Sequence, residues 1–132
     1  MYAKITKSIE ERMKVNWSLT PVEYDNIDFL EVAGQSFIRL RIHTPNKQRI
    51  AIGGLERVTG YIDGSIFVPS NSSRENIDIL VDEFSKIFEL WDDGEIEFKL
   101  ARINRVGQVN EWYQLQVIIP FTFDTCRKQK TP

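Results

Sequence analysis

Residues 56–91 constrain the fold most, because the spacing of their apolar side chains changes once, at Pro69. Before this proline, one side of the chain carries only apolar residues and glycines: Val58, Gly60, Ile62, Gly64, Ile66 and Val68. A period of two predicts a strand over residues 56–68. After the proline, apolar residues recur at helical spacing: Ile77, Leu80, Val81, Phe84, Ile87, Phe88 and Trp91. The segment therefore predicts a strand, a turn and a helix whose apolar stripe folds back onto a sheet.

This helix is expected to span residues 75–91, and a shorter amphipathic helix is expected over residues 2–13. Ser72 or Ser73 is the expected N-cap of the long helix, and Ser72 with Glu75 fits a capping box. Together with the strands, these helices predict an α+β fold. We expect a mostly antiparallel sheet with the long amphipathic helix packed on one face and a short N-terminal helix.

Other segments alternate between apolar and polar residues, as strands with one buried face do. Residues 36–44 form the first, and Pro45 is expected to end it. Residues 95–103 and 111–123 form two more, which we expect to pair as a hairpin. Because Pro120 cannot donate a ladder hydrogen bond, the last strand should end at a sheet edge or a bulge. The residues expected on the buried sides are Ile38, Leu40, Ile42, Ile96, Phe98, Leu100, Tyr113, Leu115, Val117, Ile119 and Phe121.

The strand over residues 56–68 is unusually long. It has 13 residues, whereas a typical strand has about 5–6. At about 3.3 Å per residue it would reach roughly 43 Å. It should therefore either bend at Gly60 and Gly64 or project beyond the core. A glycine inside a strand often marks a bulge or a close approach of another segment.

The chain of 132 residues fits one domain that buries a core without disulfides or metals. We place this domain at residues 1–126 and expect residues 127–132 to be a mobile basic tail. The formal net charge of -2 disfavours a protein whose main work is coating nucleic acid. The lone Cys126 cannot form an internal disulfide, and we see no signal peptide and no transmembrane run. These features are typical of a cytoplasmic protein.

The sequence lacks the common catalytic motifs: it has no P-loop, no dinucleotide-binding glycine motif and no G-x-S-x-G. The single histidine, His43, has no Cys, His or acidic neighbour at metal-ligand spacing. Cys126 would need a base to act as a nucleophile, and His43 alone could supply one. Asp92 and Asp93 are better explained as a helix stop than as a cation site. We therefore predict no catalytic residue, no metal and no cofactor, and keep a small enzyme with an unrecognised site as an alternative.

Two groups of strand residues are candidate interaction surfaces. The first group is Arg39, Arg41 and His43. Its members alternate on the side of their strand opposite the apolar residues, so they could pair with acidic residues of a neighbouring strand or subunit, or with nucleic acid. The second group is Trp112, Gln114 and Gln116. This face is typical of a surface that the chain's own helix or another subunit covers.

Residues 44–55 are expected to form a long connection, with a short strand inside it as one option. Hairpin loops usually have about 2–5 residues, and longer ordered loops tend to be functional. The segment offers charges together with apolar anchors, and Gly53-Gly54 gives it a hinge. We regard it as a candidate docking loop, the alternative being a solvated excursion with no role. Its candidate docking residues are Lys47, Arg49, Ile50 and Ile52.

The order of these elements resembles the tail-terminator and minor-tail-protein family of long-tailed, non-contractile bacteriophages. The resemblance covers residues 1–123 and depends on the order and spacing of several weak motifs. The matching features are the Asn26 and Phe29 spacing in PVEYDNIDF, the R-x-x-G of Arg57 to Gly60, the IFVP of Ile66 to Pro69 and the Trp112-Tyr113 start of the closing strand. The turn SNSSRE departs from the family, whose turn is often richer in glycine.

The resemblance implies a structural protein and not an enzyme. Family members form a hexameric ring on the growing end of the tail tube, stop its polymerisation and present a surface to the head-completion protein. The implied partners are further copies of the chain, the tail tube protein and the head connector, with DNA passing through the channel and no membrane. The implied location is the head-proximal end of the virion tail. A small nucleic-acid- or ligand-binding module that uses the Arg39, Arg41 and His43 face is the alternative.

Overall fold

The computed structural model describes residues 2–25, 27, 29–30, 34–50 and 54–126. The helices are α1 (Tyr2–Asn16) and α2 (Arg74–Phe88). The strands are β1 (Val22–Glu23), β2 (Phe37–Arg49), β3 (Leu55–Pro69), β4 (Ile96–Phe98), β5 (Arg102–Val109) and β6 (Trp112–Cys126). Each helix and strand predicted from the sequence has a counterpart here, although several boundaries differ.

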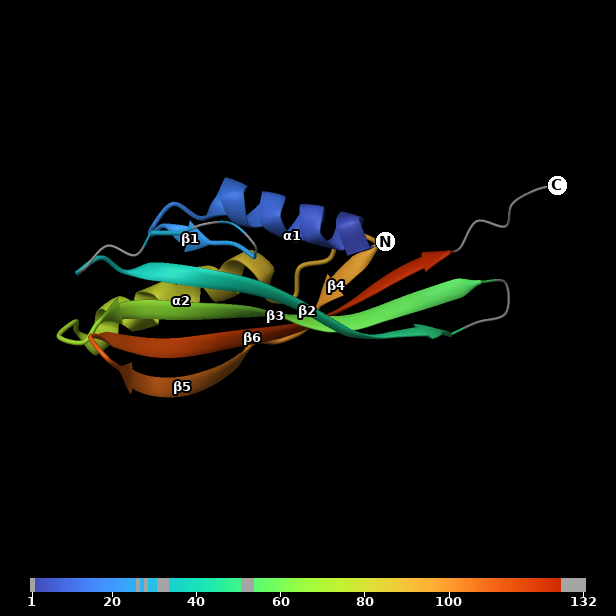
Figure 1. Ribbon diagram of the computed structural model, residues 1–132. Coiled ribbons are helices and arrows are strands. Elements are labelled where there is room, and N and C mark those ends of the chain that lie inside the picture. The colour runs from blue at the N-terminus through green and yellow to red at the C-terminus, as the bar shows by residue number, and fades with distance from the viewer. Residues whose placement is uncertain (1, 26, 28, 31–33, 51–53, 127–132) are drawn as a thin grey trace.

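The described strands form one mixed six-stranded sheet in the order β1-β2-β3-β6-β4, and β5 also pairs with β6. β1 and β2 run parallel, whereas the other neighbouring strands are antiparallel. Both helices contribute to one hydrophobic core and lie on the same face of the sheet (Figure 1). The α+β class predicted from the sequence is therefore confirmed.

The predicted contrast between a long and a short helix is wrong, because α1 and α2 each have 15 residues. α2 begins after Ser73, whose side chain accepts a hydrogen bond from the backbone N–H of Asn76 at 3.3 Å. Ser73 is therefore the N-cap, one of the two serines predicted for that role. The predicted capping box of Ser72 with Glu75 does not describe this helix start.

α2 also ends earlier than predicted, at Phe88. Two residues later, Leu90 has a φ of 60°, a left-handed conformation that a helix cannot continue through. Trp91 therefore lies outside the helix, yet it still packs on the core, since its ring stacks on Phe98 at a centroid distance of 5.7 Å. The apolar spacing correctly identified Trp91 as a packing residue and misplaced it in the helix.

The apolar stripe of α2 packs against the middle of the sheet. Phe84 and Phe88 are fully buried, with 0% of each residue exposed. The ring of Phe84 lies directly on Gly64, where an added Cβ atom would be 2.5 Å from ring carbon Cζ. At Gly60 an added Cβ would be 2.2 Å from the backbone oxygen of His43. Both glycines of β3 thus mark close approaches, as predicted from the sequence.

β2 runs on through Pro45 to Arg49, so the predicted end of this strand is wrong. The register with β3 shifts between His43 and Asn46, which gives β2 an extra residue at this point. A bulge on an edge strand tolerates a proline, because the missing N–H has no ladder partner there. As a result, Lys47 and Arg49 belong to a strand and not to a docking loop.

The hairpin predicted near the C-terminus is interrupted. Residues 99–101 separate β4 from β5, and Leu100 is 64% exposed instead of buried. Pro120 lies inside the sheet, since β6 is flanked by β3 on one side and by β4 and β5 on the other. Its backbone oxygen accepts a hydrogen bond from the N–H of Lys99 at 2.8 Å. The missing N–H of Pro120 therefore faces the break between β4 and β5, where no regular ladder is lost.

Replacing Phe84 with alanine should lower the free energy of unfolding by about 3–5 kcal/mol, because it removes a buried ring and leaves a cavity over Gly64. Chemical denaturation measures this loss. Ile79→Ala is the matched control on the same helix, since Ile79 is 48% exposed and should cost far less. Equal losses for the two variants would contradict the packing described here.

Candidate functional site

The candidate surface residues all lie on the sheet face opposite the helices, which we call the outer face. Arg39 pairs with Ser65 of β3, and Ser65 pairs with Gln116 of β6, so these side chains point to the same side. Alternation along β2 and β6 places the others there too. The outer face thus brings together the candidate residues predicted from the sequence: Arg39, Arg41, His43, Trp112, Gln114 and Gln116.

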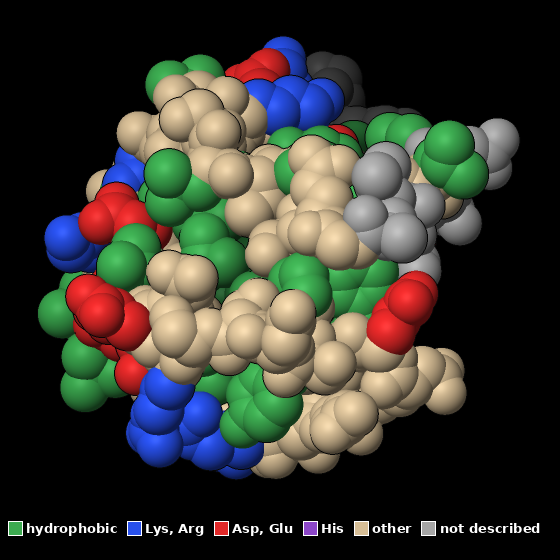
Figure 2. All heavy atoms as spheres, turned by 90° about the vertical axis from the view of Figure 1, so that its left-hand side faces the viewer, with side chains coloured by type: hydrophobic (Ala, Val, Ile, Leu, Met, Phe, Trp, Pro, Cys, Tyr) green, Lys and Arg blue, Asp and Glu red, His purple; other side chains and the backbone are tan. Residues whose placement is uncertain are grey.

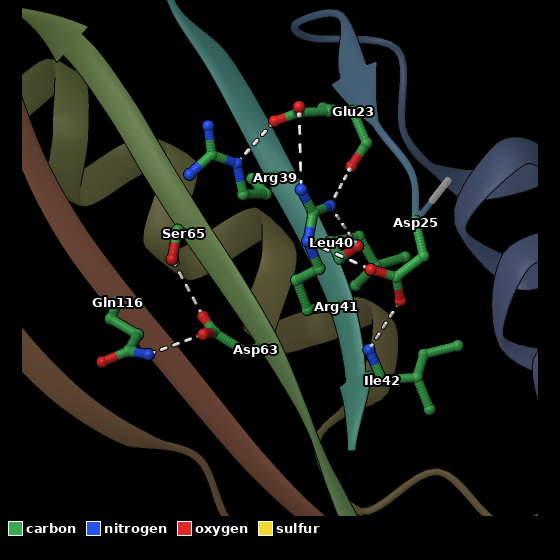
Figure 3. A network of polar contacts seen from close by, with 9 residues as sticks. All are labelled: Glu23, Asp25, Arg39, Leu40, Arg41, Ile42, Asp63, Ser65 and Gln116. Atoms are coloured by element: carbon green, nitrogen blue, oxygen red, sulfur yellow. Dashed lines mark hydrogen bonds and ion pairs between the residues drawn. The ribbon is translucent and has the colours of Figure 1, made fainter. Parts of the chain in front are cut away.

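Arg39 and Arg41 are paired with carboxylates that follow or belong to β1 (Figure 3). Arg39 Nε donates to Glu23 Oε2 at 2.5 Å, and Arg41 lies 3.6 Å from the other carboxylate oxygen of Glu23. Arg41 Nε lies 3.0 Å from Asp25 Oδ1, while Asp25 Oδ2 accepts a hydrogen bond from the backbone N–H of Ile42 at 3.3 Å. The sequence left open whether Arg39 and Arg41 pair with acidic residues of a neighbouring strand, with another subunit or with nucleic acid. In the structure they pair with acidic residues in and just after β1 of the same chain.

These ion pairs help to attach β1 to β2, because β1 is very short. It has 2 residues and pairs with β2 only at Ile38 and Arg39. The carboxylates of Glu23 and Asp25 therefore add side-chain anchors that hold the segment after α1 against the edge of β2. They also reduce the positive charge that the arginines can offer to nucleic acid.

The centre of the outer face is a hydrogen-bonded polar ladder (Figure 3). Asp63 accepts from the hydroxyl of Ser65 at 2.9 Å and from the amide of Gln116 at 2.6 Å. Gln116 in turn accepts from Asn104 of β5 at 3.1 Å. Beside the ladder, the His43 ring stacks on Tyr61 at 4.7 Å. Among the described residues, no cluster of His, Cys, Asp and Glu is arranged to hold a metal ion.

One end of the outer face holds a small second core that sequence reasoning missed. Phe37 stacks on Phe67 at 4.6 Å, and Trp112 meets the Phe37 ring edge-on at 5.2 Å. Phe29 covers Phe37 from the segment after β1, at 5.2 Å. Trp112 is consequently only 7% exposed, so the chain itself covers much of this candidate surface residue. The available signal was the placement of Phe37 and Phe67 on the otherwise polar side of their strands.

A hollow of about 320 Å³ opens beside this second core. Arg39 lies on one side of it with its guanidinium 5.1 Å from the centroid of the Phe67 ring, and Gln114 lines it from β6. Figure 2 looks onto the end of the molecule where β3 turns into α2. Small polar side chains and backbone cover much of that end, with apolar, acidic and basic side chains interspersed. Neither sign of charge dominates this view.

At the opposite end, β2, β3 and β6 continue beyond both helices as a twisted three-stranded arm (Figure 1). Arg57 of β3 forms a two-pronged ion pair with Asp124 of β6, at 2.7 and 2.9 Å. Lys47 pairs with Glu56 at 3.2 Å on the other side of the arm. These contacts join neighbouring strands, and Lys47 Nζ also lies 6.0 Å from the ring centroid of Tyr2 in α1.

The candidate docking residues lie on this arm. Lys47 and Arg49 are exposed on β2, and the backbone N–H of Ile50 donates to the carbonyl of Leu55 at 3.0 Å. Ile50 is 36% exposed, while Ile52 lies outside the described residues. The predicted loop over residues 44–55 is therefore mostly a strand hairpin that presents Lys47, Arg49 and Ile50 at the arm.

Comparison with known proteins establishes the fold and nothing finer. No family model matches the chain, and no curated protein matches it. A solved structure whose name describes no function aligns with 100% of this chain and 98% of its own, with a TM-score of 0.71 and 14% identity. In the described part of the chain, neither helix has the length and hydrophobicity needed to cross a membrane.

The arm should make stability depend on pH through Asp124. The hydrogen bond from Arg57 lowers the pKa of Asp124 below its usual value of 3.8. A lowered folded-state pKa stabilises the protein above the unfolded pKa, and that contribution is lost as pH falls through the folded value. The free energy of unfolding of the native protein should exceed that of Asp124→Asn at pH 7, with the difference shrinking below about pH 4.

Thermal or urea unfolding at several pH values measures this difference. The control is the same substitution in an Arg57→Ala background, where the pairing partner is absent and the pH-dependent difference should largely disappear. A difference that persists unchanged without Arg57 would show that the ion pair is not its source.

Proposed function

We propose that this protein is a tail terminator of a long-tailed, non-contractile bacteriophage. In this proposal it forms a hexameric ring on the end of the tail tube, stops tube polymerisation and offers a surface to the head-completion protein. It works through shape and interfaces and catalyses no reaction. It is assembled in the host cytoplasm and resides at the head-proximal end of the virion tail.

The observation that carries the proposal is the three-stranded arm. β3 and β6 have 15 residues each and β2 has 13, whereas a strand in a small domain typically has about 5–6. The distal part of these strands lies beyond the helix layer (Figure 1). A small core does not need such an extension, but a subunit of a ring can use it to reach a neighbour or the tube.

The described residues of the family-like motifs lie at the two ends of the long strands, with Arg57 and Gly60 toward the arm and Trp112 at the opposite end. Arg57 forms the two-pronged ion pair with Asp124, and Gly60 permits the close approach of β2 at its bulge. Trp112 belongs to the second core at the other end of the same strands. These motif residues therefore stabilise the fold, which supports the proposal that the chain shares the architecture of the tail-terminator family.

The alternative of a nucleic-acid-binding module has less support. Arg39 and Arg41 are already paired with Glu23 and Asp25, so binding phosphates there would compete with existing ion pairs. Contact with DNA in a tail channel would then be weak and sensitive to salt. Titration with duplex DNA at two salt concentrations separates this module from a terminator, because only the module requires tight binding.

Deleting the gene from its phage genome should give tails longer than normal that fail to join heads. The physical reason is that an uncapped tube end keeps accepting subunits. Electron microscopy of lysates measures tail length, and supplying the intact gene from a plasmid should restore normal tails. Tails of normal length joined to heads in the deletion strain would contradict the proposal.

The arm can be tested separately by a variant that joins Lys47 to Val58 through an Asn-Gly turn. Lys47 and Val58 are cross-strand partners, so a two-residue turn can close the shortened hairpin. The variant should unfold cooperatively but fail to restore normal tails, because it lacks the distal contacts. Truncation after Cys126 is the control, since it leaves the hairpin intact. Full restoration by the shortened variant would show that the arm has no capping role.

A further inference from the structure

The edges of the described sheet differ in how far other segments cover them. At the β2 edge, β1 pairs with the first residues of the strand, and the carboxylate of Asp25 accepts a hydrogen bond from the N–H of Ile42 at 3.3 Å. The outer side of β4 is covered by the segment that precedes it, because the N–H of Phe98 donates to the carbonyl of Trp91 at 2.8 Å. Both edges therefore have backbone groups that the chain itself already satisfies.

β5 is an edge without such cover, and it forms the lower margin of the sheet in Figure 1. Its only strand partner in the described structure is β6. Within the described chain, no hydrogen bond from outside β6 reaches the backbone of β5. The register with β6 shifts between Arg105 and Gly107, so the regular part of this open edge runs from Arg102 to Arg105. Its outward N–H and C=O groups are free to pair with another strand.

The two sides of this four-residue stretch differ in chemistry. Asn104 points to the outer face, because it pairs with Gln116 and donates to its side-chain oxygen at 3.1 Å. Alternation turns Arg102 to the same side, and Ile103 and Arg105 to the helix side. Ile103 is 43% exposed, although it lies on the side that packs elsewhere into the core. An approaching strand would therefore meet an apolar side chain on the helix side and a cation on the outer side.

Arg102 supplies the available positive charge of this edge. It is exposed, and among the described residues it has no ion pair and no hydrogen-bonding partner for its side chain. Arg105 differs, since it lies 3.8 Å from Asp78 of α2, which offsets its charge. Residues 98–110 contain no aspartate or glutamate. The outer side of the β5 edge is therefore suited to attract a carboxylate.

We infer that β5 is a docking edge for an extended segment of a different protein, in which apolar and acidic residues alternate. The segment adds to the sheet as a further strand beside Arg102–Arg105, so that backbone hydrogen bonds hold it in place. Its apolar side chains lie beside Ile103, and its carboxylates lie beside Arg102. This inference goes beyond the proposed ring and does not depend on it.

A second copy of the chain fits this edge less well. The distal part of β2, residues 44–49, also lacks a strand neighbour on one side in the described sheet. It carries Lys47 and Arg49 and no carboxylate, so it offers nothing to Arg102. Pairing β5 with β5 would instead bring two Arg102 side chains into one small interface. Repulsion between like charges disfavours both arrangements.

A peptide of sequence Val-Glu-Val-Glu-Val-Glu, blocked at both ends and labelled with a dye, probes the edge directly. Fluorescence anisotropy should show saturable binding that weakens as the salt concentration rises. Changes in backbone amide chemical shift should be centred on β5. The same peptide with lysine in place of glutamate should bind at least about tenfold more weakly. A Val-Glu peptide with alternate backbone nitrogens methylated should also bind weakly, because it cannot complete the ladder.

Two variants test the side chains that the inference uses. Arg102→Glu reverses the unpaired charge, and Ile103→Asn removes the apolar contact. Each should weaken binding of the Val-Glu peptide by about threefold or more. Lys86→Glu is the matched control, because Lys86 is an exposed cation of α2 away from β5, and it should leave binding unchanged. Thermal unfolding checks that each variant is folded.

Several results would overturn the inference. These are the absence of saturable binding at millimolar peptide, equal binding of the acidic and basic peptides, and equal effects of Lys86→Glu and Arg102→Glu. Sedimentation velocity of the native protein tests the remaining occupant. Self-association that Ile103→Asn abolishes would assign the edge to a second copy and so contradict the inference as well.

Discussion

The contact between Phe84 and Gly64 is the constraint on which the rest of the structure depends. The Phe84 ring lies where any side chain at residue 64 would have to be, so α2 can approach β3 closely. This contact helps to hold the helix layer on one face of the sheet, where it covers the apolar side chains of β2, β3 and β6. Neither α1 nor α2 lies on the opposite face, whose described residues are mainly polar except at the aromatic cluster of Phe37, Phe67 and Trp112.

The uncovered face is stabilised by pairing within the chain. Glu23 and Asp25 bind the arginines of β2, and Asp63 organises the ladder with Ser65 and Gln116 (Figure 3). Because these groups already satisfy one another, the face has a fixed shape and little unpaired charge to attract a ligand. A face with a fixed shape and little unpaired charge is better suited to a contact surface in an assembly than to a reactive pocket. It is consistent with the proposed tail-terminator function.

Local sequence patterns predicted much of this architecture and missed what depends on distant residues. Alternation identified the buried sides of β2, β3 and β6, and helical spacing identified the stripe of α2. Pro45 was predicted to end β2 because it cannot donate a ladder hydrogen bond, but β2 accommodates it at a bulge and continues to Arg49. Leu100 was predicted to be buried from the alternating pattern, but it lies in the break between β4 and β5 and is exposed. The partners of Arg39 and Arg41 are Glu23 in a two-residue strand and Asp25 just after it, and the local pattern does not show that this segment pairs with β2.

The central claim is that copies of this chain close into a ring on the end of a tail tube. Native mass measurement of the protein, free and after mixing with purified tail tubes, tests it most directly. We expect the tube-bound material to contain a single closed ring of defined mass at one end of each tube, whether or not free subunits are monomeric. Subunits that remain monomeric and unbound in the presence of tubes would contradict it.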